Sequence, residues 1–265
     1  MRIGVFDSGL GGVAVLKAIR ARLPGASLHY VADSAWVPYG GRGEDVIRRR
    51  ARSLTRYLVD HGADMVVVAC NTATAAAVPQ LRQDFDLPVV GMEPAVKPAT
   101  AATRNGVVGV MATVGTLQSA RFAALLDQFG GDIEVLTRAC PGLVEQVEAG
   151  DLDGPRTRTL VEQYTAPLLR AGADTLVLGC THFTFLRELV QAAAGPDVQV
   201  IDTNEAVARR VEQVSGSVVS GFQRASGVEF WTSGDVATLS APLFKLWGER
   251  APFSNLPSEF AGGTD

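Results

Sequence analysis

The sequence of 265 residues has few lysines, histidines and cysteines, and it lacks a basic excess and a long apolar run. Its 24 basic residues against 28 acidic residues give a net charge of -4, so no obligatory nucleic-acid partner is expected. No apolar run approaches the roughly 20 residues that span a bilayer. The first residues, Met1–Asp7, lack the pattern of a signal peptide. We therefore predict a cytoplasmic protein with no membrane partner.

The scarcity of lysine, histidine and cysteine also limits which cofactors the chain could bind. Three cysteines with no close pairing predict no disulfide framework, and the lack of a cluster of Cys and His ligands predicts no metal site. Lys17 and Lys245 fall inside predicted helices and Lys97 follows a predicted domain crossing, so none is placed to form a Schiff base with pyridoxal phosphate. Gly9–Gly12 lacks the spacing of a dinucleotide-binding loop, and there is no Walker lysine. We expect no cofactor.

One stretch of the chain occurs twice. Gly62–Thr72 (GADMVVVACNT) is repeated as Gly172–His182 (GADTLVLGCTH), and both copies are an apolar strand that ends in a cysteine. Flanking strands repeat as well, with Ile3–Phe6 resembling Val108–Met111. Self-similarity over several elements predicts a duplicated fold. Two similar halves facing each other would place the two cysteines on opposite walls of one site.

Apolar strands alternate with helical segments through most of the chain, which predicts an α/β protein with parallel sheets covered by helices on both faces. We place the first domain at residues 1–95 plus 205–265 and the second at 96–204. After a helix from Asn204 and an irregular Ser/Gly stretch, the chain returns through a strand at Val228–Thr232 to complete the first domain.

Polar groups gather where the predicted strands end. In parallel sheets ligands bind at the carboxyl ends of strands. Asp7–Ser8, Asp33–Gly40, Cys70–Thr72, Thr113–Thr116 and Cys180–His182 all lie at such ends. Several of them also begin predicted helices, where free N–H groups favour an anion, so a small carboxylate is the expected ligand.

Cys70 and Cys180 are the candidate catalytic groups. A thiol at a helix N-terminus is expected to have a lowered pKa, and both cysteines qualify. Two thiols on opposite walls suit removal of a proton from one face of a stereocentre and return of a proton to the other face. Asp7 near the first thiol and His182 near the second would tune the acid/base properties of the two thiols. Glu148 would either orient His182 or assist the reaction on that side.

Other features have simpler expected roles. We interpret Cys140 as structural and the run Arg48–Arg50 as a solvated helix face. Trp36 is either a lid over the site or a packed loop aromatic. Pro79 is expected to kink or interrupt its helix, and residues 252–265 are expected to fray.

The chain resembles the aspartate/glutamate racemase superfamily, in particular its cofactor-independent glutamate racemases. The resemblance covers nearly the whole chain and rests on six segments in order: Gly4–Gly12, Asp33 with Val37–Gly40, Ala69–Thr74, Ala139–Pro141 through Val147–Glu148, Gly179–His182 and Ile201–Asp202.

The resemblance implies interconversion of L- and D-glutamate, which supplies D-glutamate for bacterial peptidoglycan. It implies two flavodoxin-like domains related by pseudo-two-fold symmetry, with the active site between them, and a homodimer. In this family's pattern Cys70 and Cys180 match the acid/base thiols. The implied assisting and substrate-contacting residues are Asp7, Ser8, Tyr39, Gly40, Asn71, Thr72, Glu148, Thr181 and His182.

The sequence departs from the family pattern at Trp36, where Arg is common, at Ala95, where Gly is usual, and at Thr184, where Pro is usual. Other functions stay open at this point. A related two-thiol racemase could act on aspartate or another small acid. A binding or redox-sensing module could use Cys70 and Cys180 as a switch, and a regulatory role toward a cell-wall metabolite or a DNA topoisomerase is a further alternative.

Overall fold

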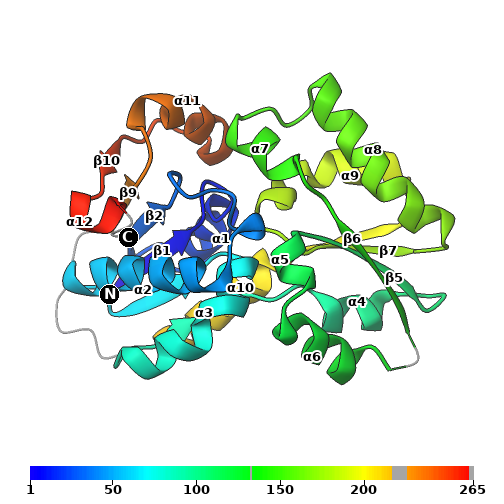
Figure 1. Cartoon of the computed structure of the whole chain (residues 1–265), viewed down its shortest axis with the longest axis horizontal. Coiled ribbons are helices and arrows are strands. Elements are labelled where there is room, and N and C mark those ends of the chain that lie inside the picture. The colour runs from blue at the N-terminus through cyan, green and yellow to red at the C-terminus, as the bar shows by residue number, and fades with distance from the viewer. Residues whose placement is uncertain (132, 217–225, 263–265) are drawn as a thin grey trace.

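A computed structural model describes residues 1–131, 133–216 and 226–262, and it contains two separate parallel β-sheets covered by helices. The two sheets lie in two lobes, the first at the left and the second at the right of Figure 1. In the described ranges no helix is both long and apolar enough to cross a membrane. The expected irregular Ser/Gly stretch falls mostly at residues 217–225, outside the described residues.

Among the described residues, the first sheet has the strand order β10-β9-β2-β1-β3-β4. Its strands are β1 (Arg2–Asp7), β2 (Ser27–Ala32), β3 (Met65–Val68), β4 (Val89–Val90), β9 (Gly227–Thr232) and β10 (Phe253–Asn255). The helices of this part are α1 (Val13–Arg22), η1 (Tyr39–Gly41), α2 (Glu44–Asp60), α3 (Asn71–Asp84), α10 (Asn204–Ser215), α11 (Val236–Trp247) and α12 (Ser258–Ala261).

The second sheet has the order β6-β5-β7-β8 in the described chain. Its strands are β5 (Val107–Ala112), β6 (Glu134–Ala139), β7 (Thr175–Leu178) and β8 (Gln199–Ile201). Its helices are α4 (Val96–Ala102), α5 (Val114–Leu117), α6 (Ala120–Phe129), α7 (Leu143–Glu148), α8 (Pro155–Arg170), η2 (His182–Leu186) and α9 (Arg187–Ala194).

The two sheets repeat one topology. The order β2-β1-β3-β4 in the first matches β6-β5-β7-β8 in the second, and it is the flavodoxin-like order. Even the register repeats: Phe6 pairs with Val68, and Met111 pairs with Leu178. Each cysteine of the repeat follows two residues after its strand. The prediction of two parallel-sheet domains is confirmed, whereas the domain boundaries and the pseudo-two-fold relation stay predictions.

Side chains along the buried strands point alternately to the two faces of each sheet, which explains why helices cover both faces. In β1, Ile3 and Val5 face a core cluster with α1, α10 and α11, while Phe6 faces a second cluster with α2 and α3. In β5, Met111 shares the first cluster with α7 and α8, and Val110 packs with α4 and α6. Because successive residues point to opposite faces, each sheet is buried on both sides.

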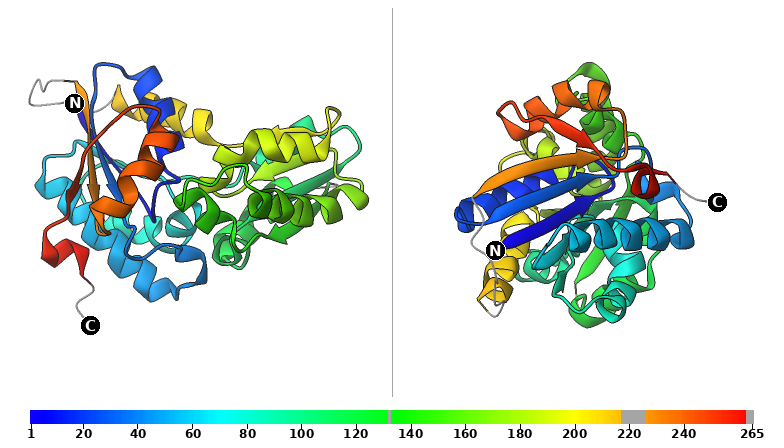
Figure 2. Two further views of the ribbon diagram at one scale, coloured as in Figure 1. Left: turned by 90° about the horizontal axis from the view of Figure 1, so that it is seen from above. Right: turned by 90° about the vertical axis from the view of Figure 1, so that its left-hand side faces the viewer.

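The C-terminal region completes the first sheet. After residue 226 the chain forms β9, which pairs with β2, and then β10, which pairs with β9. Figure 2 shows these late strands beside the first strands of the chain. The expected fraying from residue 252 is therefore wrong for residues 253–261: Phe253 and Leu256 are buried, and α12 follows. Residues 263–265 lie outside the described residues.

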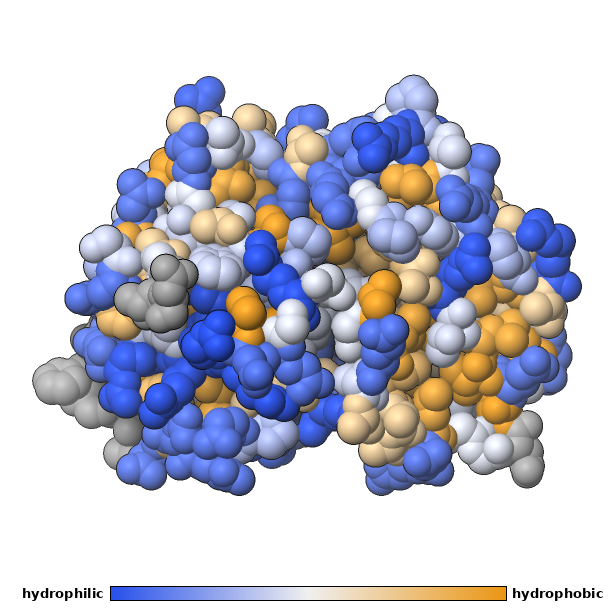
Figure 3. Space-filling model, in the orientation of Figure 1, coloured by the Kyte–Doolittle hydropathy of each residue, from blue (hydrophilic) through white to orange (hydrophobic). Residues whose placement is uncertain are grey.

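Two local expectations also fail in part. Helix α3 continues through Pro79 to Asp84, so the proline does not interrupt it, whereas the kink stays a prediction. Only part of the arginine run on α2 is solvated: Arg48 and Arg49 are exposed, but Arg50 is buried. The helical period explains the difference, because adjacent residues on a helix point about 100° apart. The front of the first lobe, which carries α2 in Figure 1, is mostly hydrophilic in Figure 3.

Candidate active site

The carboxyl ends of the strands in both sheets meet at one small enclosed cavity. Its walls come from both halves of the repeat and include both cysteines. The lining residues are Ser8, Pro38, Tyr39, Gly40, Cys70, Asn71, Thr72, Thr113, Val144, Cys180, Thr181 and His182. The space left between them is about 10 Å³, roughly the room of one water molecule. A molecule with several carbon atoms can enter only if these walls separate.

On the first side of the cavity, Cys70 caps a helix. It is the N-cap of α3, and its Sγ accepts a hydrogen bond from the Ala73 N–H at 3.5 Å. Behind it lies Asp7, which is fully buried and accepts a hydrogen bond from the Gly12 N–H at 2.7 Å. The neighbouring Asn71 has a buried side chain, and neither its Oδ1 nor its Nδ2 has a hydrogen-bond partner among the described residues. These amide atoms are available to a ligand.

On the second side, Cys180 stands next to an imidazole. Its Sγ lies 3.8 Å from His182 Nδ1, and His182 Nε2 lies 2.6 Å from Glu148 Oε1. The same Glu148 oxygen accepts a hydrogen bond from the Leu10 N–H at 2.6 Å. His182 begins the 3-10 helix η2 rather than an α-helix, and α9 starts only at Arg187. The structure thus forms a line of groups from Cys180 through His182 to Glu148.

Two glycines of the loop after β1 make room for the side chains of His182 and Glu148. A Cβ added at Gly11 would lie 2.3 Å from His182 Nδ1, and one added at Gly9 would lie 2.1 Å from Glu148 Oε1. Such approaches are well below any van der Waals contact. Gly9 and Gly11 therefore allow close packing against Glu148 and His182, a use that the sequence pattern alone does not indicate.

Burial dominates the acidity of the first thiol. Burial and the nearby Asp7 raise the pKa of Cys70 well above its usual value, although the Ala73 N–H acts in the opposite direction. The lowered pKa predicted for Cys70 is therefore wrong: the helix N-terminus is present, but removal of the thiolate from water outweighs it. The raised pKa favours the neutral thiol of Cys70.

The assisting groups are shifted as well. Burial raises the pKa of Asp7, and the neighbouring His182 only partly offsets this effect. Burial lowers the pKa of His182, but hydrogen bonds to Cys180 and Glu148, together with the charge of Glu148, outweigh burial and raise it well above the usual value. The raised pKa favours the imidazolium form of His182, which lies between Cys180 and Glu148.

Hydroxyl groups join the two halves at the mouth of the cavity. Thr72 Oγ1 of α3 lies 2.9 Å from Thr113 Oγ1 and 3.2 Å from Thr116 Oγ1, both at the start of α5. Gly40 packs against the same element, because a Cβ there would lie 2.7 Å from Thr113 Cβ. These contacts join the first and second halves beside the cavity.

The structure brings together all of the predicted site residues. Asp7 and Glu148 do not line the cavity but support groups that do. Pro38 and Thr113 also line the cavity; they belong to the predicted strand-end segments but were not singled out as site residues. Val144 is the one lining residue that no predicted strand-end segment contains, because it is an apolar residue of α7 that no motif marks.

Cys140 and Trp36 lie outside the lining of the cavity. Cys140 is buried outside the cavity lining, and its thiol donates to the Arg138 carbonyl at 3.3 Å, consistent with a structural role. Trp36 is a packed loop aromatic: its Nε1 donates to the Ala261 carbonyl at 3.3 Å. In the ranges that the model covers, no group of three or more His, Cys, Asp or Glu side chains could hold a metal ion.

Comparisons with known proteins point to one family. Residues 4–211 match the model of the Asp/Glu/Hydantoin racemase family. Glutamate racemase of Ectopseudomonas mendocina is 53% identical over 251 residues, covering 94% of this chain and 95% of the relative. The corresponding protein of Pseudomonas aeruginosa is 54% identical over 248 residues, covering 93% and 94%.

A solved structure resembles the whole chain. The crystal structure of Escherichia coli glutamate racemase in complex with L-glutamate and the activator UDP-MurNAc-ala has a TM-score of 0.87 and 30% sequence identity. The similarity covers 96% of this chain and 97% of that one. With a family model that spans most of the sequence and relatives that match nearly all of it, the chain belongs to the Asp/Glu/Hydantoin racemase family.

Proposed function

We propose that this protein is a cofactor-independent glutamate racemase in which Cys70 and Cys180 are the two acid/base groups. The observation that carries the proposal is that both thiols line one enclosed cavity, at equivalent positions of a repeated fold. One thiol for each face of Cα suits a reaction in which a proton leaves one face and another arrives on the opposite face.

The different surroundings of the thiols suggest their protonation states. Burial raises the pKa of Cys70, so we propose that Cys70 starts as the acid and that Cys180, beside the His182 imidazolium, starts as the base. In one direction Cys180 removes the Cα proton and Cys70 donates its own proton from the other face. The product then leaves Cys180 as a thiol and Cys70 as a thiolate, which is the starting state for the reverse reaction.

Polar groups around the thiols would hold the substrate. We propose that Asn71, with its unpaired amide, and Ser8, Thr72 and Thr181 bind the amino and carboxylate groups of glutamate. The N-terminus of α3 favours a carboxylate by its dipole. Tyr39–Gly40 forms the remaining polar wall.

We propose that catalysis needs no pyridoxal phosphate. The lysines lie elsewhere: Lys245 Nζ donates to the Gly150 carbonyl at 3.1 Å, and Lys97 Nζ lies 5.5 Å from the centre of the Phe129 ring. The proton is removed directly from the amino acid, so the buried site and its positioned acid must stabilise the carbanionic transition state.

Glutamate is preferred over aspartate because relatives more than 50% identical over nearly the whole chain are glutamate racemases. The test is incubation of the purified protein with L-glutamate and L-aspartate separately, without added cofactor, followed by circular dichroism. We expect loss of signal with glutamate. Rapid turnover of aspartate alone would contradict the proposed substrate.

The wider role follows the family resemblance. We propose that the protein acts in the cytoplasm, as a homodimer, and that its D-glutamate is used for peptidoglycan synthesis. Sedimentation of the purified protein tests the dimer. Loss of growth on depletion, restored by external D-glutamate, tests the role in the cell wall.

A further inference from the structure

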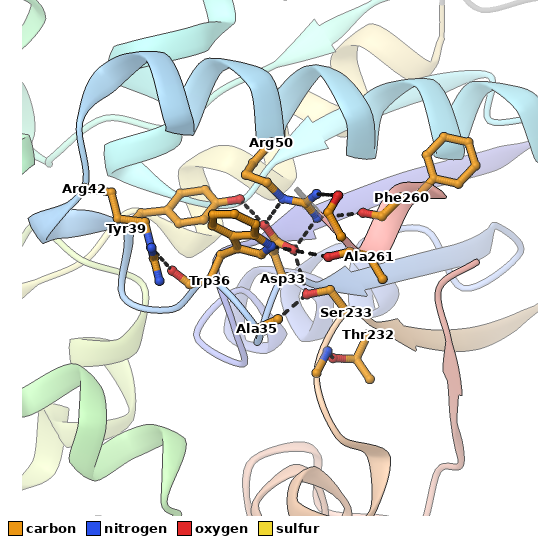
Figure 4. Close-up of polar contacts among 12 residues, drawn as sticks. Asp33, Ala35, Trp36, Tyr39, Arg42, Arg50, Thr232, Ser233, Phe260 and Ala261 are labelled. Carbon is orange, nitrogen blue, oxygen red and sulfur yellow. Dashed lines mark hydrogen bonds and ion pairs between the residues drawn. The ribbon is translucent and has the colours of Figure 1, made fainter. Parts of the chain in front are cut away.

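A buried ion pair lies one layer outside the cavity. Arg50 of α2 donates to both carboxylate oxygens of Asp33, from Nε to Oδ2 at 2.9 Å and from Nη2 to Oδ1 at 2.7 Å. The Asp33 side chain is 0% exposed and that of Arg50 is 5% exposed. Figure 4 shows this pair at the centre of a network from several elements. It differs from the exposed pair of Arg48 with Glu44 on the same helix.

Asp33 binds two further donors. The Tyr39 hydroxyl donates to Oδ2 at 2.5 Å, and Ser233 Oγ, which follows β9, donates to Oδ1 at 2.7 Å. The carboxylate thus accepts from a guanidinium and two hydroxyls. Burial and the charge of Asp33 raise the pKa of Tyr39 well above its usual value, so the phenol keeps the proton that it donates.

The outer side of Arg50 is bound to the C-terminal segment. Its Nη2 donates to the Phe260 carbonyl at 2.7 Å, and Nη1 to the Gly262 carbonyl at 3.5 Å. Trp36 covers the guanidinium with its ring, 5.2 Å from Cζ, and donates to the Ala261 carbonyl. Segment 257–262 therefore closes over Arg50 and fixes its position (Figure 4).

The inner end of this network is a wall of the cavity. Tyr39 is 1% exposed and lines the cavity beside Gly40 and Cys70. A buried ion pair is weak evidence for stability alone, because removal of two charges from water offsets most of their attraction. Its bidentate geometry does fix orientation strongly. The network therefore fixes the direction of the Tyr39 side chain.

We propose that Arg50 is a positioning residue for the substrate cavity: it acts through Asp33 on Tyr39–Gly40, and the C-terminal segment 257–262 holds it in place. The inference rests on the proposed function, because it concerns how the same cavity binds its substrate. Arg50 itself does not touch the reacting atoms.

The main test is Arg50→Lys, which keeps the charge but loses the bidentate fork. The Tyr39–Gly40 wall is expected to bind the substrate and the transition state equally, so its displacement should weaken substrate binding without slowing the chemical step. We therefore expect KM for glutamate to rise about tenfold while kcat stays within about twofold. The matched control is Arg49→Lys, the exposed neighbour on α2, which should leave both constants unchanged.

Two further variants separate positioning from general destabilisation. If Arg50 acts through the Tyr39 hydroxyl, the effect of Arg50→Lys on KM should nearly vanish in a Tyr39→Phe background, whereas a merely structural effect would be additive. A chain that ends at Leu256 keeps Arg50 and Asp33 but loses the two carbonyls that accept from Arg50 and the Ala261 carbonyl that accepts from Trp36. Its KM should rise about threefold, since hydrogen bonds to a charged group are lost while the ion pair remains.

The outcomes distinguish the two claims. No turnover of glutamate by the unaltered chain contradicts the proposed function and removes the basis of this inference. Normal turnover with an unchanged KM in Arg50→Lys, or additive effects with Tyr39→Phe, overturns the inference alone. If Arg50→Lys does not fold, the chain ending at Leu256 decides in the same assay: an unchanged KM there overturns the inference.

Discussion

The two thiols occupy equivalent places in the repeat but have different neighbours. Cys70 caps an α-helix, accepts a backbone N–H and has a buried carboxyl group, Asp7, behind it. Cys180 precedes a 3-10 helix and stands beside His182, which Glu148 holds from the other side. Duplication explains why both thiols reach one cavity; the residues after each cysteine explain why they differ.

This difference matters for acid/base chemistry. A reaction that needs one acid and one base at the same moment is helped if the two groups prefer opposite protonation states. Burial raises the pKa of Cys70 and so keeps its proton in place, whereas Cys180 lies beside the imidazolium of His182. We infer that the asymmetry sets a defined resting state, with Cys70 as the thiol.

The largest effect should come from removal of either thiol. Cys70→Ala and Cys180→Ala should each reduce racemisation by about 1000-fold or more, because each loses an acid or base that has no substitute in the cavity. Polarimetric or circular dichroism rates check this, and Cys140→Ala is the control, since Cys140 is outside the cavity lining. Near-normal rates in both variants would contradict the two-thiol account.

The next effect concerns the Cys180 side alone. His182→Asn should lower kcat by about 100-fold, because the thiolate loses its imidazolium. Because His182 lies beside Cys180 and not beside Cys70, the variant should affect proton removal in one reaction direction only. The kinetic isotope effect with Cα-deuterated substrate should therefore increase for one enantiomer only. Equal increases for L- and D-glutamate would show that the two sides are not chemically separate.

A smaller effect is expected from the glycine loop. Gly11→Ala places a methyl group against the His182 ring, so the imidazole must shift, and we expect kcat to fall by about tenfold. Gly25→Ala is the matched control, because a Cβ there meets no atom within 4 Å. A Gly11→Ala rate equal to that of Gly25→Ala would mean that the position of His182 is not critical.

The smallest effect is on stability. The pKa of His182 is raised in the folded protein, so its contribution to stability is fully present below the unfolded value of about 6.5 and is lost as the pH rises through the folded value. The difference in free energy of unfolding between the unaltered chain and His182→Gln should therefore shrink by about 1 kcal/mol or more from pH 6 to pH 9. Urea denaturation at both pH values measures it. A difference that grows with pH would contradict the raised pKa.

Much of this arrangement could be predicted from the sequence, because strands buried on both faces have a distinctive pattern. The repeat of Gly62–Thr72 located both thiols, and strand ends located their polar neighbours. The pKa of Cys70 could not be predicted, because the depth of burial depends on how the two halves close. Arg50 was misinterpreted for a similar reason: its partners, Asp33 and segment 257–262, are distant in sequence.

The central claim, one thiol for each face of Cα, is tested most directly by racemisation of L-glutamate in heavy water. The D-glutamate formed in the first turnovers should carry deuterium at Cα, while the L-glutamate that remains keeps its original hydrogen. This result follows because the donating thiol exchanges its proton with solvent and is not the group that removed the substrate proton. Retention of the original hydrogen in D-glutamate would contradict the account, since it would mean that a single group moves the proton from one face to the other.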